Sequence, residues 1–333
     1  MYKKIHILII LLAFCIGAKA QDPVFSQPFV AAQFLSPASV GSGGYENRFQ
    51  SNTRSQFIGG NNLYRTIAVG WDTRFSRKDP ELLNYLGIGT QIISDQVMGG
   101  IMQTNYVSLN LAYHLFLDND AHKNFALGLG TTFANTSLDK SRLRFGDQYD
   151  YTATYTGNGS LDLLKPFPSK FSVNAGVLYS IHSEQLFFQI GANAFFFSKP
   201  EVTYSLYNES SGLRKTMFVS VEKTISDIYT IMAHASYGSR NNVSQYFGGG
   251  AVGLPLSYKW NEVRRLYIGC FYRVGDAVIP SVSLMLNNYN MGLSYDFYNN
   301  SLSGASIKQN GFEITLSTSF GKKRHEFLRT LFD

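Results

Sequence analysis

Alternation of apolar and polar residues over about ten positions is the feature that most constrains the fold of this chain. The segments 106–117, 289–297 and 312–320 show it with few exceptions. Successive side chains of a strand point to opposite faces, so each segment predicts a β-strand with one apolar and one polar face. The most regular example is segment 171–182, in which Phe171, Val173, Ala175, Val177, Tyr179 and Ile181 alternate with residues that are small or polar, except Leu178.

The length of these strands favours a membrane protein over a soluble β-sandwich. Strands of soluble proteins average about 5 to 6 residues, whereas a tilted transmembrane strand has about 9 to 11. Only 16% of the residues are charged, and after position 20 no uninterrupted apolar run is long enough for a spanning helix. We therefore predict an all-β fold: a transmembrane antiparallel outer-membrane β-barrel. At roughly 20 to 24 residues for each strand with its turn, about 14 strands are expected.

The first twenty residues have the features of an export signal. Lys3 and Lys4 precede an apolar run at 7–16, and the triplet 18–20 is a small-x-small cleavage site. Removal of this segment, with its three lysines, would lower the formal net charge of +6, so no nucleic-acid partner is expected. Cys270 would be the only remaining cysteine, and no disulfide within the chain is predicted.

Four segments are predicted along the chain. Residues 1–20 are a signal peptide and 45–320 the barrel, in which the irregular stretch 139–170 is expected to be a long extracellular loop. Residues 21–44 contain three prolines and lack clean alternation, so they are interpreted as an N-terminal extension: a periplasmic segment, a plug or a loosely paired first strand. Residues 321–333 are a basic C-terminal tail, either a solvated end or a contact with a periplasmic partner.

Several sequence blocks resemble one known family. Residues 21–27, QDPVFSQ, are similar to the opening QDPxFSQ of the PorP/SprF family of type IX secretion outer-membrane proteins from Bacteroidetes. The stretch from Leu35 to Gly41 is similar to its LNPAxxG block, with Ser36 in place of the common Asn. The blocks 62–66, 87–95 and 295–314 also look like this family, so the resemblance extends over nearly the whole predicted mature chain.

The resemblance implies a non-enzymatic protein that docks, helps to export or anchors a secreted cell-surface protein. The cargo expected is a large adhesin with a type B C-terminal signal that serves gliding motility. The partners implied are the C-terminal domain of that adhesin, the type IX periplasmic ring lipoprotein and outer-membrane lipid. Residues of the opening motif are predicted to bind the partner, with a structural plug role as the alternative: Asp22, Pro23, Phe25, Ser26 and Gln27.

The sequence also bears on two other functional classes. A passive pore is the main alternative, because charged residues on the polar faces of the strands would line a lumen. An enzymatic barrel is disfavoured, since the chain contains no GxSxG, HExxH or Walker A motif. No cofactor and no metal site are expected. The charged positions are Arg65 or Arg74, Asp72, Arg265 and Arg273, and the histidines predicted to face the lumen are His114, His182 and His234.

Overall fold

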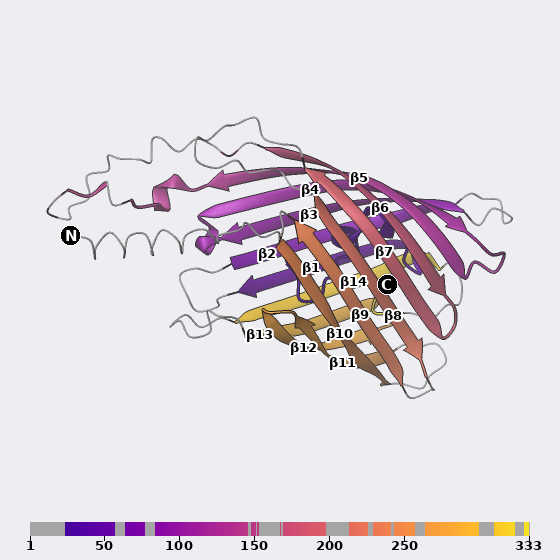
Figure 1. Ribbon diagram of the computed structural model, residues 1–333. Helices are drawn as coiled ribbons and strands as arrows, with labels where there is room; N and C mark the ends of the chain where they lie inside the picture. The colour runs from indigo at the N-terminus through magenta and orange to yellow at the C-terminus, as the bar shows by residue number, and fades with distance from the viewer. Residues whose placement is uncertain are drawn as a thin grey trace, which may run out of the picture.

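Fourteen antiparallel strands form one closed barrel in the computed structural model (Figure 1). The structure describes residues 24–56, 64–76, 84–145, 148–150, 152, 167, 169–197, 213–225, 229–240, 243–256, 264–299, 310–323 and 330–332. The strands are β1 (Tyr45–Gln56), β2 (Tyr64–Ser76), β3 (Tyr85–Val97), β4 (Met102–Phe116), β5 (Lys123–Leu138), β6 (Lys170–His182), β7 (Leu186–Phe197), β8 (Arg214–Thr224), β9 (Thr230–Arg240), β10 (Val243–Pro255), β11 (Arg264–Arg273), β12 (Ala277–Leu286), β13 (Tyr289–Tyr298) and β14 (Gly311–Lys323).

Each strand pairs with its neighbours in sequence, and β1 pairs with β14 to close the barrel. In the β1–β14 register, Arg54 lies opposite Glu313 and Asn52 opposite Thr315. Closure leaves no unpaired sheet edge, which is what a sheet inside a bilayer requires. The predicted fold class and the strand number of about 14 are therefore confirmed.

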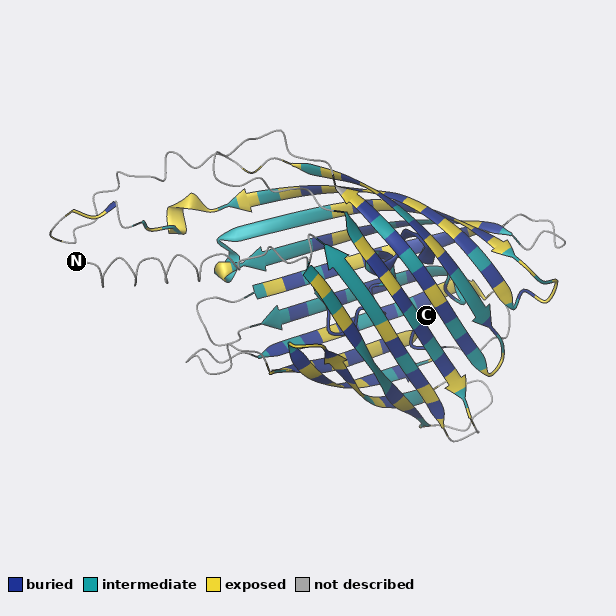
Figure 2. Cartoon of the chain, in the orientation of Figure 1, coloured by how far each residue is buried: buried dark blue, intermediate teal, exposed yellow. Residues whose placement is uncertain are grey.

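Burial alternates along the strands as the sequence pattern predicts (Figure 2). On β5, Leu127, Leu129 and Phe133 are exposed on the outer wall, whereas Ala126 and Thr132 are buried inside. The same alternation holds on β6 and β13. Bilayer lipid favours large apolar residues on the outer wall, and a narrow lumen favours small polar ones.

The two ends of the barrel differ in the length of their connections. At the end where β1 begins and β14 finishes, the connections are short, such as 183–185 and 287–288. At the opposite end lie the connections 139–169, 198–213 and 299–310. Outer-membrane barrels have short periplasmic turns and longer extracellular loops, so β1 begins on the periplasmic side. Only part of the expected loop 139–170 is described.

Helical structure is minor in the described part of the chain. It consists of one α-helical turn, α2 (Ala32–Leu35), and the 3-10 turns η2 (Pro37–Ser39), η3 (Met98–Gly100) and η4 (Lys140–Arg142). Within the described residues, none of the helices has the length and apolar character needed to cross a membrane.

The lumen is filled by the chain itself. Residues 24–42, which include α2 and η2, precede β1 and are mostly buried, and η2 contacts β4, β5 and β6. Three apolar clusters join this luminal segment to the wall. Leu35 and Ala38 pack on Leu178 and its neighbours, Phe25 and Ala31 on Ala68 and Ile93, and Phe29 and Val30 on Phe187 and its neighbours. The core of the molecule is therefore the interior of the barrel.

Candidate functional site

The first anchor of the luminal segment is a buried carboxylate on β14. Glu313 accepts the backbone N–H of Ser26 at 2.5 Å and that of Gln27 at 2.9 Å. The amide of Asn52 on β1 donates to the same carboxylate at 3.2 Å. Three donors converge on this one buried side chain, and a buried polar group left without its partner costs about 1–3 kcal/mol, so Glu313 fixes the start of the segment in the lumen.

A cluster of charged side chains surrounds this anchor. Asp296 on β13 accepts the hydroxyl of Ser26 at 2.5 Å and pairs with Arg54 at 2.5 Å and Arg273 at 3.2 Å. Arg54 also donates to the Val24 carbonyl at 2.6 Å. A buried charge is tolerated when it is paired and its remaining positions are hydrogen-bonded. Three strands and the luminal segment supply those partners here.

The middle of the segment is held by uncharged side chains. Gln33 donates to the carbonyls of Trp71 at 3.1 Å and Thr90 at 3.3 Å, and accepts from Asn110 at 3.2 Å. Farther along, the Ser36 hydroxyl accepts the N–H of Ala38 at 3.0 Å and so caps η2, in the position where the resembling family commonly has Asn. A serine therefore suffices for this cap.

Two glycines of the barrel wall allow the segment to approach the strands. A Cβ added at Gly128 on β5 would lie 2.2 Å from the Ala38 nitrogen. One added at Gly87 on β3 would lie 2.2 Å from the Val40 carbonyl oxygen. Contacts that short are prohibited, so the backbone of η2 is packed directly against the backbone of the wall.

Near the periplasmic end the segment is held by a further ion pair. Arg48 on β1 pairs with Asp72 on β2 at 3.0 Å and donates to the Ser39 carbonyl at 2.9 Å. Asp72 in turn accepts the N–H of Gly41 at 2.9 Å. The Nε2 atom of His114 lies 2.8 Å from the Val40 carbonyl oxygen. From here the chain enters β1.

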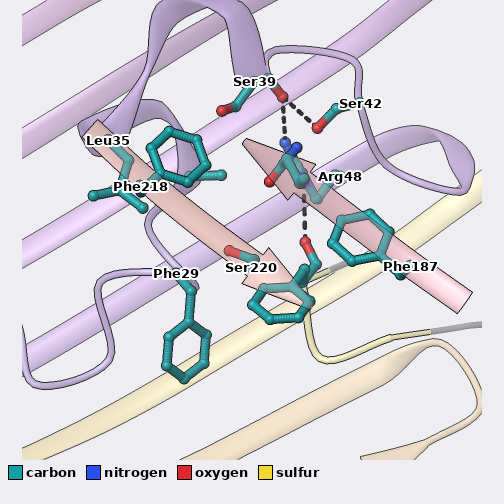
Figure 3. A pocket seen from close by; sticks show the side chains of 11 residues that line it. Phe29, Leu35, Ser39, Ser42, Arg48, Phe187, Phe218 and Ser220 are labelled. Carbon is teal, nitrogen blue, oxygen red and sulfur yellow. Dashed lines mark hydrogen bonds between the residues drawn. The ribbon is translucent and has the colours of Figure 1, made fainter. Parts of the chain in front are cut away.

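Residues from the far end of the chain also lie in the lumen. Thr330, Leu331 and Phe332 are buried, and the ring of Phe332 packs on Phe29 and Phe187 with centroid separations of 5.7 and 5.1 Å. The cavity left between them has a volume of about 10 Å³, which is room for about one water molecule. Figure 3 shows this cavity, with Arg48 directed at Ser39 beside it.

The predicted partner-binding residues are only partly within the described chain. Asp22 and Pro23 lie outside the described residues. Phe25, Ser26 and Gln27 are brought together against the lumen wall and are almost inaccessible, at 2%, 0% and 1% exposure. In this conformation they contact the barrel itself, and partner binding by these residues stays a prediction.

Most of the charged residues suggested to line a pore face the lumen, and three of them are buried there. Asp72, Arg74 and Arg273 face the lumen and are buried, and Arg265 lies half-buried on the same face of β11 as Arg273. Arg65 is exposed on the outer side of β2, so Arg74 is the inward member of that pair. The three histidines predicted to face the lumen are all buried: His114, His182 and His234.

Sequence reasoning missed the residues that hold the segment. The alternation in segments 289–297 and 312–320 puts Asp296 and Glu313 on polar strand faces, but no local pattern indicates their partners at positions 26 and 27. A charged residue on the lumen face of a strand is the signal that points to such an anchor, since it needs a partner there. Within the described ranges, no group of three or more His, Cys, Asp or Glu residues has the arrangement of a metal site.

A closed, filled barrel of fourteen strands with an apolar outer wall is an outer-membrane β-barrel. The family described as type IX secretion system membrane protein PorP/SprF matches residues 17–318, and the chain belongs to that family. The resemblance seen in the sequence blocks is confirmed, and so is the outer-membrane location. No curated protein matches the chain.

Solved structures are similar to the chain at low sequence identity. A mutant of the TodX monoaromatic hydrocarbon channel has a TM-score of 0.52 and 9% identity, and the match covers 87% of this chain and 94% of the channel. The translocator domain of the autotransporter NalP from Neisseria meningitidis has a TM-score of 0.41 and 10% identity, over 88% of this chain and 96% of that one. The likeness to the TodX channel concerns the barrel fold alone.

Proposed function

We propose that this protein is a non-enzymatic component of the type IX secretion system that holds a secreted cell-surface protein at the outer membrane. It docks the cargo, helps its export or anchors it. The cargo proposed is a large adhesin with a type B C-terminal signal that serves gliding motility. The family and the fold are those of membrane secretion proteins rather than enzymes.

The observation that carries the proposal is the filled lumen. Residues 24–42 cross the interior of the barrel from the Asp296 cluster, near the extracellular end, to Arg48 at the periplasmic end. A barrel filled in this way offers solutes little room, and its useful surfaces are its two mouths. Protein partners recognise such surfaces through loops and by backbone pairing with extended segments.

The passive pore is the second candidate, because the lumen face carries charged side chains. Five of those charges are paired with one another: Arg48 with Asp72, and Arg54 and Arg273 with Asp296. A pore would require the luminal segment to leave, which would break the hydrogen bonds from Ser26 and Gln27 to Glu313. Holding a partner requires no such step.

The experiment that tests the proposal is an affinity pull-down of the tagged protein from native outer membranes in mild detergent, followed by mass spectrometry. Recovery of a large adhesin or of the type IX ring lipoprotein is the expected result. Recovery of the barrel alone, together with steady ion conductance in planar bilayers, would favour the pore.

A matched variant tests the role of the opening motif. Deletion of residues 22–27 is expected to abolish partner recovery while the barrel stays folded, as judged by a heat-modifiable band on a gel. Phe25, Ser26 and Gln27 lie against the wall in this structure, so the deletion also tests whether the anchored segment is needed. Retention of the partner by a folded deletion variant would remove these residues from the proposal.

A further inference from the structure

The luminal position of Thr330–Phe332 is not explained by barrel formation. These residues lie outside the fourteen strands. The last strand, β14, already closes the barrel wall by pairing with β1. All three are nonetheless buried, at 0%, 5% and 6% exposure. The lumen therefore contains a socket that receives a short segment of the chain, in which Leu331 and Phe332 form a turn.

The polar contacts of this socket are made to the peptide backbone. Glu222 on β8 accepts the Leu331 N–H at 3.0 Å, and Arg48 donates to the Phe332 carbonyl at 3.3 Å. A third and longer contact runs from the Asn290 amide to the Thr330 carbonyl, at 3.4 Å. Main-chain hydrogen bonds of this kind give affinity without selecting particular side chains.

The side-chain selectivity of the socket lies in its aromatic wall. The Phe332 ring stacks on Phe187 and meets Phe29 edge-on, and Leu331 belongs to the same apolar cluster. Aromatic pairs of this kind contribute about 0.5–1.5 kcal/mol beyond the area they bury. An aliphatic residue followed by an aromatic one is thus the pair of side chains that fits.

The position of the socket determines which compartment supplies an occupant. Arg48 lies near the start of β1, Asn290 near the start of β13, and Glu222 near the end of β8. All three positions are at the end with the short connections, which is the periplasmic one. A segment that enters the socket therefore comes from the periplasm.

We propose that this socket, formed by Arg48, Phe187, Glu222 and Asn290, is a peptide-binding site that the chain's own Thr330–Phe332 occupies in cis. A protein partner takes it in trans by inserting a short segment of the same shape, with an aliphatic residue followed by an aromatic one. The identity of that partner as the exported protein rests on the proposed function. The segment Thr330–Phe332 competes with the partner for the socket at the high effective concentration of a tethered ligand. It therefore occupies the socket until a partner displaces it.

The test uses the full-length protein and a variant that ends at position 329, both in detergent. The probe is a fluorescent peptide of sequence Arg-Thr-Leu-Phe-Asp, and binding is measured by fluorescence anisotropy. The shortened protein is expected to bind the peptide about tenfold or more tightly than the intact protein, because the tethered competitor is gone. A peptide with both apolar residues replaced by alanine is expected not to bind.

Two substitutions in the shortened protein separate specific from general binding. Glu222→Gln removes the charge that receives the Leu331 N–H and is expected to weaken peptide binding about tenfold. Glu184→Gln lies in the exposed turn between β6 and β7 and is expected to leave binding unchanged. Equal effects of the two substitutions on peptide binding would contradict the proposal that the socket binds the peptide.

A second route covers the case in which the shortened chain does not fold. The full-length double variant Leu331→Ala with Phe332→Ala keeps residues 330–333 but removes the two apolar side chains that pack on the aromatic wall. It is expected to bind the peptide more tightly than the native protein. A folded barrel, shortened or doubly substituted, that binds the peptide no better than the native protein overturns the inference. If the pull-down still recovers a secretion partner, the proposed function stands without the socket.

Discussion

Arg54 of β1 and Asp296 of β13 form an ion pair of 2.5 Å inside the barrel, and neither side chain is more than 4% exposed. The same two residues bind the luminal segment, since Arg54 donates to the Val24 carbonyl and Asp296 accepts the Ser26 hydroxyl. The wall and the segment thus share one set of buried charges. The stability of the barrel wall therefore depends on the presence of the luminal segment.

Substitution Asp296→Asn should release the start of the luminal segment. Arg54 and Arg273 would lose a charged partner, and a broken buried ion pair costs about 3–5 kcal/mol. The readout is maleimide labelling of a cysteine placed at the buried position 31, in a background that carries Cys270→Ser. Labelling should be slow in the parent and fast in Asp296→Asn. Equally slow labelling in both would contradict the shared anchor, and Asp120→Asn in an exposed turn serves as the control.

Substitution Gly128→Ala should destabilise the protein from within the lumen. Its Cβ would lie 2.2 Å from the Ala38 nitrogen, and overpacking of this kind costs about 1–3 kcal/mol. The matched control is Gly238→Ala on β9, where nothing lies within 4 Å of the added Cβ. Unfolding in urea should show a lower free energy of unfolding for Gly128→Ala only. A loss of the same size for both would place the segment away from β5.

The strand pattern could be predicted from the sequence because successive side chains of a strand point to opposite faces, so residues two positions apart share a face. The burial alternation on β6 holds from Phe171 to Leu178. The one apolar exception in the sequence pattern is explained by packing, since Leu178 faces the lumen and contacts Leu35 and Ala38 of the luminal segment. What seemed an irregularity of the pattern is a contact site.

The contents of the lumen could not be predicted in the same way. Residues 24–42 have no strand periodicity, so the sequence left three interpretations open, and the contacts that hold them are distant in sequence. Ser26 and Glu313 are 287 positions apart. Leu331 and Phe332 were grouped with a basic tail, because no local pattern indicates that two apolar residues will turn back into the barrel.

An arginine on the outer wall should report the depth of its position in the bilayer. Leu129 lies at the middle of β5 and is 63% exposed on the outer wall. Leu129→Arg is expected to cost about 2–4 kcal/mol, because a charge at the midplane is disfavoured, whereas Leu117→Arg beyond the end of β4 should cost about 0–1 kcal/mol. The comparison is made by unfolding in lipid vesicles. A larger cost at position 117 would contradict the assigned membrane span.

The assigned orientation predicts which connections are reached from outside the cell. In a Cys270→Ser background, Ser141→Cys lies in the connection between β5 and β6 and should react with a membrane-impermeant maleimide on intact cells. Ser183→Cys lies in the short connection between β6 and β7 and should react only after the cells are broken. The reverse pattern would mean that the barrel is inserted the other way round.

The most direct test of the central claim, that this barrel is filled by its own chain and acts by holding a protein, is the ion conductance of the purified protein in planar bilayers. The intact protein is predicted to show no steady conductance, and a variant that lacks residues 24–42 is predicted to conduct once it is inserted. Steady conductance of the intact protein at the level of the deletion variant would contradict the filled lumen and favour a pore.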